Sequence, residues 1–452
     1  MTTPIKNIVV LMLENRSFDH LVGYLRTDKY PIDGVRGNES NYVDPLTRKT
    51  RPVPVSDDAP YVPDLDPSPG HEFGNVAVQI HGANPAPTPS VGSNVGYVAD
   101  YDAVAGAGRG GAVMRCFASG KLPAMHALAQ EFALCDAWFA SMPGPTWPNR
   151  FFAHCATSGG FVDNAVRNYP MRTLYQNLEA ANINWRIYYH DFPQSLALAN
   201  QRPYFLRGDY ELFDQAFLRD CASGLLPQFS FIEPRYFNEG ASRANDQHPI
   251  HGVLGGDALI AAVYEGIRNS LQWPETMLIV LWDEHGGFFD HRLAPVPSIP
   301  PDGSTEFFDF RSYGVRVPAI VVSAYTPKAT IDSLVYDHTS LAATAKEIFG
   351  LPAFLTARDA KSNTVSHLYN GPLRTDVPAA LPGASQPEML RARSFQSDSE
   401  PPNDLQVSLL ALARSLNPAA RELVAAPPPP TEGEAAAEAR AHLSAFAAAR
   451  QS

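Results

Sequence analysis

The chain has 452 residues, of which 45% are hydrophobic, and its 35 basic and 47 acidic side chains give a formal charge of −12. This much apolar material can bury a large core, which excludes disorder of the whole chain. The acidic balance and the absence of a Lys/Arg cluster argue against a nucleic-acid-binding protein, whereas a phosphorylated small molecule needs only local cations. The length fits two or three domains or one large α/β domain.

The sequence contains no segment typical of membrane insertion or export. No uncharged apolar run approaches the roughly 20 residues that a membrane-spanning helix needs, so we expect a soluble protein without a transmembrane segment. The first residues lack a basic leader and a long apolar core, and we therefore expect no N-terminal signal peptide. The protein is then cytoplasmic or exported by a route that the sequence does not reveal.

The cysteines indicate no disulfide framework. They are widely spaced and include no C-x-x-C pair, so we expect buried free thiols. The four are Cys116, Cys135, Cys155 and Cys221.

Continuous apolar runs predict strands that are buried on both faces, as in a parallel sheet covered by helices. In chain order these runs are Ile8–Leu13, Met277–Trp282 and Ala319–Val322. Apolar residues at helical spacing predict helices at Ala258–Ile267 and Leu341–Ile348. The alternation predicts an α/β fold with a central, mostly parallel sheet flanked by helices.

Two stretches lack this periodicity and are predicted to be long loops. Residues 36–94 are rich in Pro, Asp, Ser and Gly, and residues 105–111 are rich in Gly. Loops of that length on a rigid scaffold are usually functional, so we expect them at the active site.

The C-terminal part is predicted to be a helical extension. Leucines at helical spacing predict an amphipathic helix packed on the body; they are Leu405, Leu409, Leu412 and Leu416. After Pro427–Pro430, the Ala-rich residues 434–450 predict a helical appendage without chemistry. We therefore expect a catalytic domain at 1–400 and a helical extension at 401–452.

Polar side chains follow two of the predicted strands. The first strand runs into Glu14 and Asn15, and the strand 277–282 runs into Asp283 and Glu284. Ligands of open α/β sheets collect at the carboxyl ends of strands. Crowded carboxylate and amide oxygens repel one another unless a cation holds them, and an oxygen-rich shell suits a hard or borderline divalent metal. The alternative is a helix N-cap at Glu14 and solvated loop carboxylates at the other two acidic positions.

Residues 144–152 predict a tight turn that opens a helix, with Pro148 in the first turn. A hydroxyl at a helix N-terminus lies near the positive end of the dipole, which favours an alkoxide and an anion. Thr146 is therefore a candidate nucleophile. The alternative is a helix cap, which is the commoner role of Ser or Thr before a helix.

Three histidines lie in polar loops or at a helix start, where imidazole serves as a general acid or as a donor to phosphoryl oxygens. His71 follows Pro-Gly, His248 lies in Asp-Gln-His-Pro, and His338 lies in Tyr-Asp-His-Thr-Ser.

Five segments of the sequence together resemble the phosphoesterase family of bacterial and plant non-specific phospholipases C and related acid phosphatases. That family is itself similar to the alkaline phosphatase superfamily. The segments occur in the order 14–19, 146–150, 283–291, 313–318 and 336–340, and the match covers roughly residues 5–360.

The resemblance implies an alkaline phosphatase-like fold and metal-assisted phosphoryl transfer through a phosphorylated enzyme. One divalent metal ion would be held by Glu14, Asn15, Asp283 and Glu284, and Thr146 would be the nucleophile. The family's loop histidines fall on His71, His248 and His338, which would be catalytic.

The substrate would be a phosphoester small molecule or a phospholipid head group, hydrolysed by an enzyme of the phospholipase C or acid phosphatase type. Secreted phospholipases of the family carry an export signal that this sequence does not show, which leaves open a soluble phosphomonoester or phosphodiester. Two alternatives are a sulfatase-like hydrolase and a catalytically silent binding protein on the same fold. Thr146 does not provide the aldehyde that sulfatases usually form from Cys or Ser.

Overall fold

The computed structural model describes residues 3–62, 65–82, 93–295, 299–300, 302, 308–389 and 396–448. Its strands, in chain order, are β1 (Asn7–Leu13), β2 (Ser40–Tyr42), β3 (Pro52–Pro54), β4 (Ala133–Cys135), β5 (Trp185–Tyr189), β6 (Tyr210–Leu212), β7 (Phe229–Glu233), β8 (Thr276–Trp282), β9 (Ala319–Ser323) and β10 (Thr330–Asp332). Eight of them form one central sheet in the order β10-β4-β9-β8-β1-β7-β5-β6, and β2 and β3 form a separate antiparallel pair.

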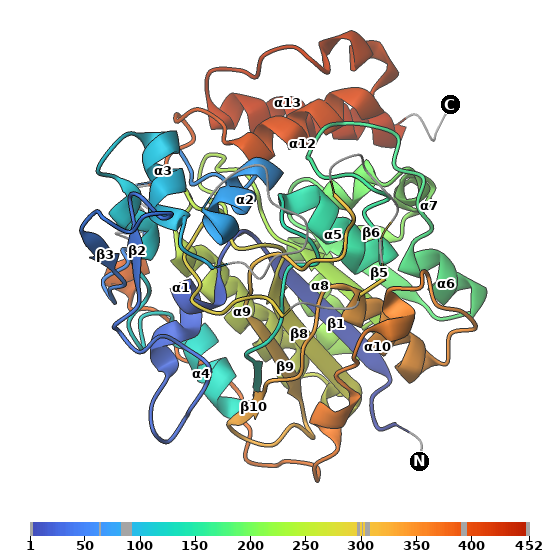
Figure 1. Ribbon diagram of the computed structural model, residues 1–452. Coiled ribbons are helices and arrows are strands. Elements are labelled where there is room, and N and C mark those ends of the chain that lie inside the picture. The colour runs from blue at the N-terminus through green and yellow to red at the C-terminus, as the bar shows by residue number, and fades with distance from the viewer. Residues whose placement is uncertain are drawn as a thin grey trace.

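The central sheet is parallel except for β9, which runs antiparallel to β8 and to β4 (Figure 1). Every residue of β1 and β8 is buried, as the continuous apolar runs predict. All three predicted strands are found, as β1, β8 and β9, and the predicted mostly parallel sheet is confirmed. The three-residue strands β4, β6 and β10 are too short to give a pattern in the sequence.

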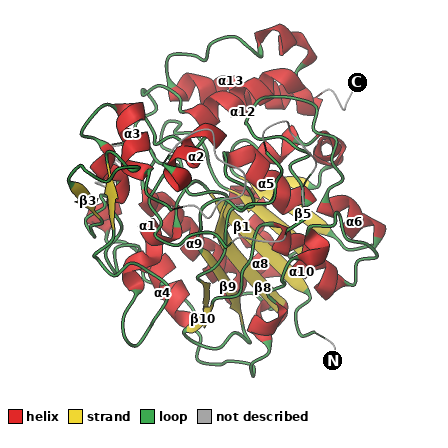
Figure 2. Cartoon of the chain, in the orientation of Figure 1, coloured by secondary structure: helices red, strands yellow, loops and turns green. Residues whose placement is uncertain are grey.

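The helices are α1 (Phe18–Val22), α2 (Phe73–His81), α3 (Tyr97–Ala105), α4 (Pro123–Glu131), α5 (Thr146–Cys155), α6 (Leu174–Ala180), α7 (Arg202–Arg207), α8 (Phe213–Ser223), α9 (Val253–Arg268), α10 (Thr339–Phe349), α12 (Asp404–Leu416) and α13 (Glu432–Ala448). In Figure 1, α5 and α10 lie in front of the sheet and α8 and α9 behind it, and Figure 2 shows the same two layers around the yellow strands. The helices predicted at 258–267 and 341–348 lie within α9 and α10. In the described part of the chain, no helix combines the length and the apolar character needed to cross a bilayer.

The predicted loops contain more regular structure than expected. The stretch 36–94 includes β2, β3 and the nine-residue helix α2, while residues 83–92 of it lie outside the described residues. The loop prediction was wrong at α2, where Phe73, Val76, Ala77 and Ile80 recur at helical spacing inside a stretch otherwise rich in Pro, Asp, Ser and Gly. Val76 and Ala77 are buried, and their packing stabilises the helix. The Gly-rich stretch 105–111 follows α3 and runs into a 3-10 turn, Gly110–Met114.

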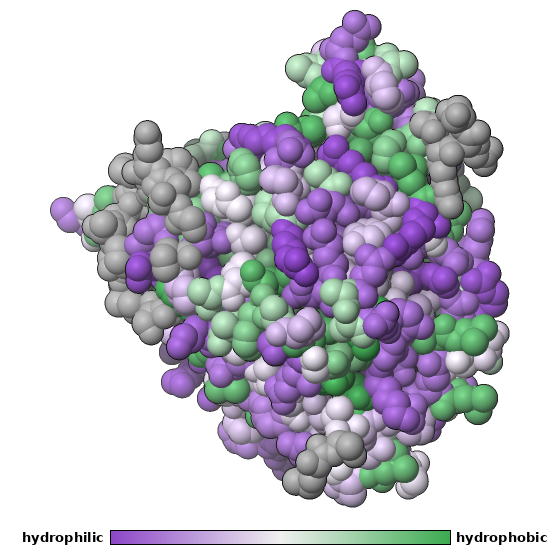
Figure 3. Space-filling model, turned by 90° about the vertical axis from the view of Figure 1, so that its right-hand side faces the viewer, coloured by the Kyte–Doolittle hydropathy of each residue, from purple (hydrophilic) through white to green (hydrophobic). Residues whose placement is uncertain are grey.

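The C-terminal helices pack on the body at the end of the sheet where the strands have their carboxyl ends (Figure 1, red). The four predicted leucines of α12 are buried and belong to the same hydrophobic core as β1 and β8. The appendage predicted at 434–450 is α13, whose last described residue is Ala448. Hydrophilic and hydrophobic side chains are interspersed on the face that Figure 3 shows. The division into 1–400 and 401–452 stays a prediction.

All four cysteines are buried and free, as expected.

Candidate active site

The polar residues after β1 and β8 lie side by side because the two strands are parallel neighbours in register. Leu13 pairs with Trp282, so Glu14 and Asp283 follow at the same edge of the sheet. The backbone N–H of Asn15 donates to Asp283 Oδ1 at 2.9 Å. All four predicted metal-binding side chains are completely buried, which does not fit solvated loop carboxylates; they are Glu14, Asn15, Asp283 and Glu284.

A glycine after β8 lets the two loops approach this closely. Gly286 has a φ of +64°, and a Cβ placed on it would lie 2.2 Å from the carbonyl oxygen of Asn15. Any larger residue would therefore push Asn15 away from Asp283. Asn15 itself has a φ of 48°, a conformation that Asn tolerates better than most residues.

Thr146 is the first residue of α5, and its hydroxyl points away from the helix it opens. Its Oγ1 lies 3.4 Å from Glu14 Oε2 and 3.4 Å from Asn15 Oδ1. The N-cap position is Pro145, which has no capping side chain, and the N–H of Trp147 is instead bonded to Asn164. The hydroxyl of Thr146 therefore faces the acidic residues and does not cap the helix.

One of the two carboxylate oxygens of Glu14 is fixed by hydrogen bonds from neighbouring side chains. Its Oε1 accepts from Arg150 Nη2 at 2.5 Å and from Gln194 Nε2 at 2.8 Å, while Oε2 faces the Thr146 hydroxyl. Arg150 lies one helical turn after Thr146, so α5 supplies both the hydroxyl and the cation that orients the carboxylate. Burial raises the pKa of Glu14, and Arg150 opposes that rise.

The oxygen atoms around Thr146 fit a divalent cation. Asp283 Oδ2 is buried and makes no hydrogen bond in the described structure, and Glu14 Oε2 and Asn15 Oδ1 each lie 3.4 Å from the Thr146 hydroxyl. Burial, then Glu14 and Glu284, raise the pKa of Asp283 well above its usual range. Such a set of repelling oxygens suits a hard divalent ion, since a cation relieves the repulsion.

Glu284 turns toward the histidine side of the site. Its Oε1 lies 2.6 Å from His71 Nδ1, and its Oε2 accepts from the backbone N–H of Gly286 at 2.7 Å. Burial alone would raise the pKa of Glu284, but His71 and His285 lower it to about 2. Asn15 Nδ2 is also near, 2.8 Å from His71 Nδ1, so Asn15 links the two sides of the site.

The other two histidines differ sharply in their partners. His338 uses both ring nitrogens: Nε2 donates to the backbone carbonyl of Asp283, and Nδ1 accepts from Trp138 Nε1 at 3.1 Å. His248 is completely buried, and neither of its ring nitrogens makes a hydrogen bond in the described structure. Burial lowers the pKa of both histidines to about 4.

Asp404 is a site residue that the sequence analysis did not find. It is the first residue of α12, and its carboxylate lies 2.5 Å from His71 Nε2 and 3.6 Å from His248 Nε2. No local signal distinguishes it from any acidic residue at a helix start. Arg150 was also missed, although its spacing of four from Thr146 places both on one helix face.

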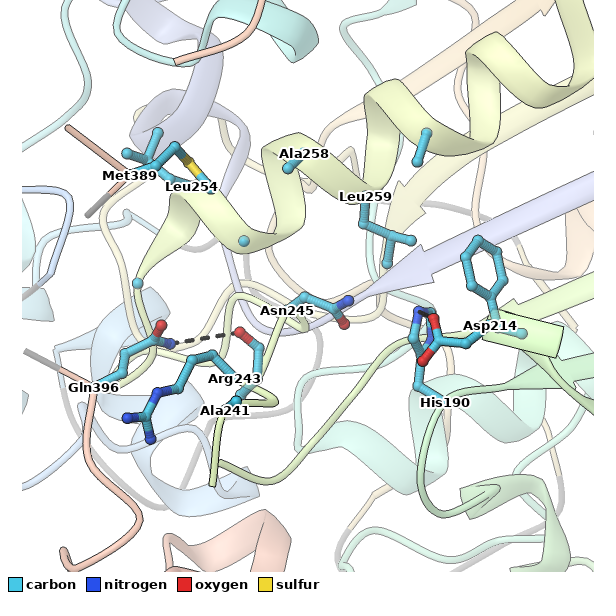
Figure 4. Close-up of a pocket in the computed structure, with 15 residues that line it drawn as sticks. His190, Asp214, Ala241, Arg243, Asn245, Leu254, Ala258, Leu259, Met389 and Gln396 are labelled. Carbon is cyan, nitrogen blue, oxygen red and sulfur yellow. Dashed lines mark hydrogen bonds and ion pairs between the residues drawn. The ribbon is translucent and has the colours of Figure 1, made fainter. Parts of the chain in front are cut away.

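Two of the cavities lined by described residues lie near the carboxyl ends of the strands. The larger, of about 630 Å³, is bordered by His71 and Asp404 and has further acidic side chains around it, among them Asp66, Glu72 and Glu400. The smaller, of about 260 Å³, lies between His190, Arg243 and α9 and contains none of the predicted site residues (Figure 4). Of these two cavities, the larger one therefore borders the site, at His71 and Asp404.

The geometry agrees with the comparison to known families, in which the model of the phosphoesterase family matches residues 5–352. The chain belongs to the phosphoesterase family. The predicted resemblance is thereby confirmed, and with it the class of enzyme, a hydrolase of phosphoester bonds.

Its relatives include plant and bacterial proteins. Non-specific phospholipase C6 of Arabidopsis thaliana is 39% identical over 438 residues, which cover 92% of this chain and 81% of the relative. Non-specific phospholipase C3 of the same plant is 36% identical over 446 residues, covering 92% and 83%. Phospholipase C B of Mycobacterium tuberculosis strain H37Rv is 28% identical over 460 residues, covering 86% and 80%.

Similarity to solved structures is weaker. The phosphonate monoester hydrolase of Agrobacterium radiobacter superposes with a TM-score of 0.33 at 12% identity, covering 87% of this chain and 84% of that one. A protein of the alkaline phosphatase superfamily from Vibrio parahaemolyticus gives a TM-score of 0.34 at 14% identity, covering 57% and 68%.

Proposed function

We propose that the protein is a metal-dependent phosphoesterase of the phospholipase C type that works through a phosphothreonine at Thr146. The observation that carries the proposal is the position of the Thr146 hydroxyl, 3.4 Å from Glu14 Oε2 and from Asn15 Oδ1. The names of the plant relatives support the phospholipase C type, and the buried oxygen atoms support the metal.

In the first step, Thr146 Oγ1 forms a bond to phosphorus as the bond from phosphorus to the leaving oxygen breaks. The hydroxyl proton of Thr146 passes through solvent to the leaving oxygen, which departs as an alcohol. Arg150 and Gln194 keep Glu14 Oε2 directed at Thr146. A divalent cation at Glu14, Asn15, Asp283 and Glu284 would acidify the hydroxyl and offset the charge of the phosphoryl oxygens.

In the second step, water attacks the phosphorus of phosphothreonine and the bond to Oγ1 breaks. Oγ1 takes up the proton that the attacking water loses, which restores the enzyme. His71, which borders the cavity, and His248, which lies buried behind Asp404, stabilise the charge of the departing oxygen. His338 instead holds the backbone after β8 in place through the Asp283 carbonyl.

The cavity favours a phosphodiester with a head group over a small monoester. Its volume of about 630 Å³ lies within the range of small-molecule sites, and it borders His71. Its acidic border favours a substrate with a cationic group. An acid phosphatase would not need this space.

The test is a Thr146→Ala and Thr146→Ser pair assayed on a phosphocholine diester, a chromogenic phosphomonoester and an aryl sulfate, with and without chelator. We expect Thr146→Ala to remove turnover and Thr146→Ser to retain it, with the diester as preferred substrate and activity lost on chelation. Thr344→Ala, which changes a buried threonine on α10 outside the site, is the matched control.

Near wild-type turnover by Thr146→Ala would favour direct attack by water. Hydrolysis of the aryl sulfate alone would favour a sulfatase-like enzyme. Absence of turnover on all three substrates would favour a binding protein.

A further inference from the structure

A third strand of the central sheet ends in an acidic residue beside the site. β7 lies next to β1, on the side opposite β8, and its last residue is Glu233. The side chain of Glu233 is completely buried and has no part in the proposed mechanism. We propose that Glu233 is a positioning residue, which holds Gln194 in the place where its side chain fixes Glu14. This role rests on the proposed function, in which Glu14 holds the metal ion beside Thr146.

Glu233 differs from the predicted metal-binding carboxylates because both of its oxygens are occupied. Oε2 accepts from the backbone N–H of Gln194 at 2.7 Å, and Oε1 accepts from the backbone N–H and the hydroxyl of Ser195 at 3.3 and 2.6 Å. Asp283 Oδ2, in contrast, makes no hydrogen bond in the described structure. A carboxylate that already accepts three hydrogen bonds does not need a cation, so Glu233 acts on the loop and not as a metal ligand.

The contacts of Glu233 fix the start of a short 3-10 helix, Gln194–Ala197. The first N–H groups of a helix have no partner inside it, and Pro193 at the N-cap provides no capping side chain. Glu233 accepts from the first two of these N–H groups, which ties Gln194 to the carboxyl end of β7. From there, Gln194 Nε2 donates to Glu14 Oε1 at 2.8 Å and leaves Oε2 directed at Thr146.

A second buried carboxylate, Asp257, shows what a purely structural contact of this kind looks like. Asp257 lies on α9, is 2% exposed and accepts from the backbone N–H groups of Ala124 and Met125 at the start of α4. The side chains of these two residues are apolar, so the chain of hydrogen bonds ends there. Gln194, by contrast, has a polar side chain that continues the chain of hydrogen bonds to Glu14.

The test combines Glu233→Gln and Gln194→Leu in a double-mutant cycle of the full chain. In Glu233→Gln, an amide NH₂ group replaces one of the two oxygens that accept hydrogen bonds. We expect each single variant to lower kcat on a phosphocholine diester, at saturating metal, by about 10–100-fold, as residues that orient a ligand usually do. KM should stay nearly unchanged, because neither residue contacts the substrate. Since both residues act through Glu14, the double variant should lose hardly more than the more impaired single variant.

Hydrogen exchange of the backbone amides gives a readout that needs no turnover. Glu233→Gln should lose protection of the amides of Gln194 and Ser195, whereas Gln194→Leu should keep it because the backbone contacts remain. This readout separates the two proposals. A wild type without turnover would contradict the proposed function, and unchanged protection in Glu233→Gln would overturn the role of Glu233.

Asp257→Asn is the matched control, which should lower thermal stability and keep kcat. An equal loss of kcat in Asp257→Asn would overturn the proposal, as would near wild-type kcat in Glu233→Gln or single losses that multiply in the double variant. Glu233→Asp serves if Glu233→Gln does not fold, because it keeps the negative charge near Arg150 and shortens the side chain. It should also lose amide protection and lower kcat, and wild-type values of both would overturn the proposal.

Discussion

The buried pair of Arg150 and Glu14 shows how single residues set the chemistry of this site. Both side chains are at most 2% exposed, and Arg150 is the main cation beside Glu14. Removing one partner of a buried pair leaves an uncompensated charge and costs about 3–5 kcal/mol. We therefore expect Arg150→Met to lower the free energy of unfolding by about that amount, measured by denaturant titration.

Arg167→Met is the control for this prediction. Arg167 pairs with Asp163 on the surface, where both side chains are about 40% exposed (39% and 41%), and such pairs contribute about 0–1 kcal/mol. Equal effects of the two substitutions would mean that Arg150 has no special role. Gln194→Leu removes the neutral donor to Glu14 and leaves Arg150 in place. We therefore expect it to weaken metal binding while lowering the free energy of unfolding less than Arg150→Met does.

The histidines differ in how they should affect the two kinds of substrate. His248 faces the side proposed for the departing oxygen, so His248→Ala should reduce activity on an alkyl phosphoester by about 10²–10⁴ and on a nitrophenyl ester far less, because nitrophenolate leaves unaided. The sequence suggests the same for His338, but both of its ring nitrogens are occupied. We expect His338→Ala to reduce activity on both substrates equally, because it displaces the Asp283 backbone. Steady-state rates on the two esters distinguish these roles. A loss in His338→Ala that is larger on the alkyl ester than on the nitrophenyl ester would contradict this assignment.

At the scale of single elements, the sequence predicts the long buried strands and the strand ends that carry the site. The runs at β1 and β8 and their polar C-terminal neighbours are visible because a completely buried strand has a continuous apolar pattern. The order of the strands is not visible, because the register of Leu13 with Trp282 depends on the packing of the whole sheet. Asp404 shows the same limit: it reaches His71 only because α12 packs over the site.

The turn after β8 provides a prediction about an element. A Cβ on Gly286 would lie 2.2 Å from the Asn15 carbonyl, whereas one on Gly350 would meet nothing within 4 Å. The two glycines have nearly the same φ, +64° and +62°, so their backbone strain as alanine should be similar, about 1–3 kcal/mol. We expect Gly286→Ala to be the more destabilising and to lose metal binding, while Gly350→Ala keeps it. Thermal unfolding and metal titration of both variants measure this difference, and equal behaviour would contradict the close approach.

At the scale of the whole molecule, the C-terminal helices complete both the core and the site. The leucines of α12 belong to the core that surrounds β1 and β8, and Asp404 contacts His71. Glu432, at the start of α13, is buried and accepts from Asn238 Nδ2 at 3.0 Å and from Gln406 Nε2 at 2.6 Å. The amphipathic pattern predicts that α12 packs on the body. The pattern does not indicate which surface of the body the helix covers.

His251 lies between two acidic residues that come from distant parts of the chain. Its Nδ1 lies 2.6 Å from Asp246 and its Nε2 lies 3.6 Å from Glu432. Burial alone would lower the pKa of His251, but Asp246 and Glu432 raise it to about 10. Because the folded-state pKa lies above the ordinary value of about 6.5, the protonated ring stabilises the fold fully below pH 6.5. That stabilisation is lost progressively as the pH rises from about 6.5 to about 10.

We therefore expect the free energy of unfolding of the wild type to fall across this range by more than that of His251→Gln, whose side chain does not titrate. Each unit of pKa difference corresponds to about 1.4 kcal/mol, so the two curves should converge by several kcal/mol toward alkaline pH. Denaturant titrations of both proteins at intervals between pH 6 and 10 give the difference between their free energies of unfolding. The titration of tyrosines and lysines is common to both proteins and cancels in this difference. Parallel curves would show that folding does not raise the pKa of His251, and that Glu432 is held by Asn238 and Gln406 without help from an imidazolium.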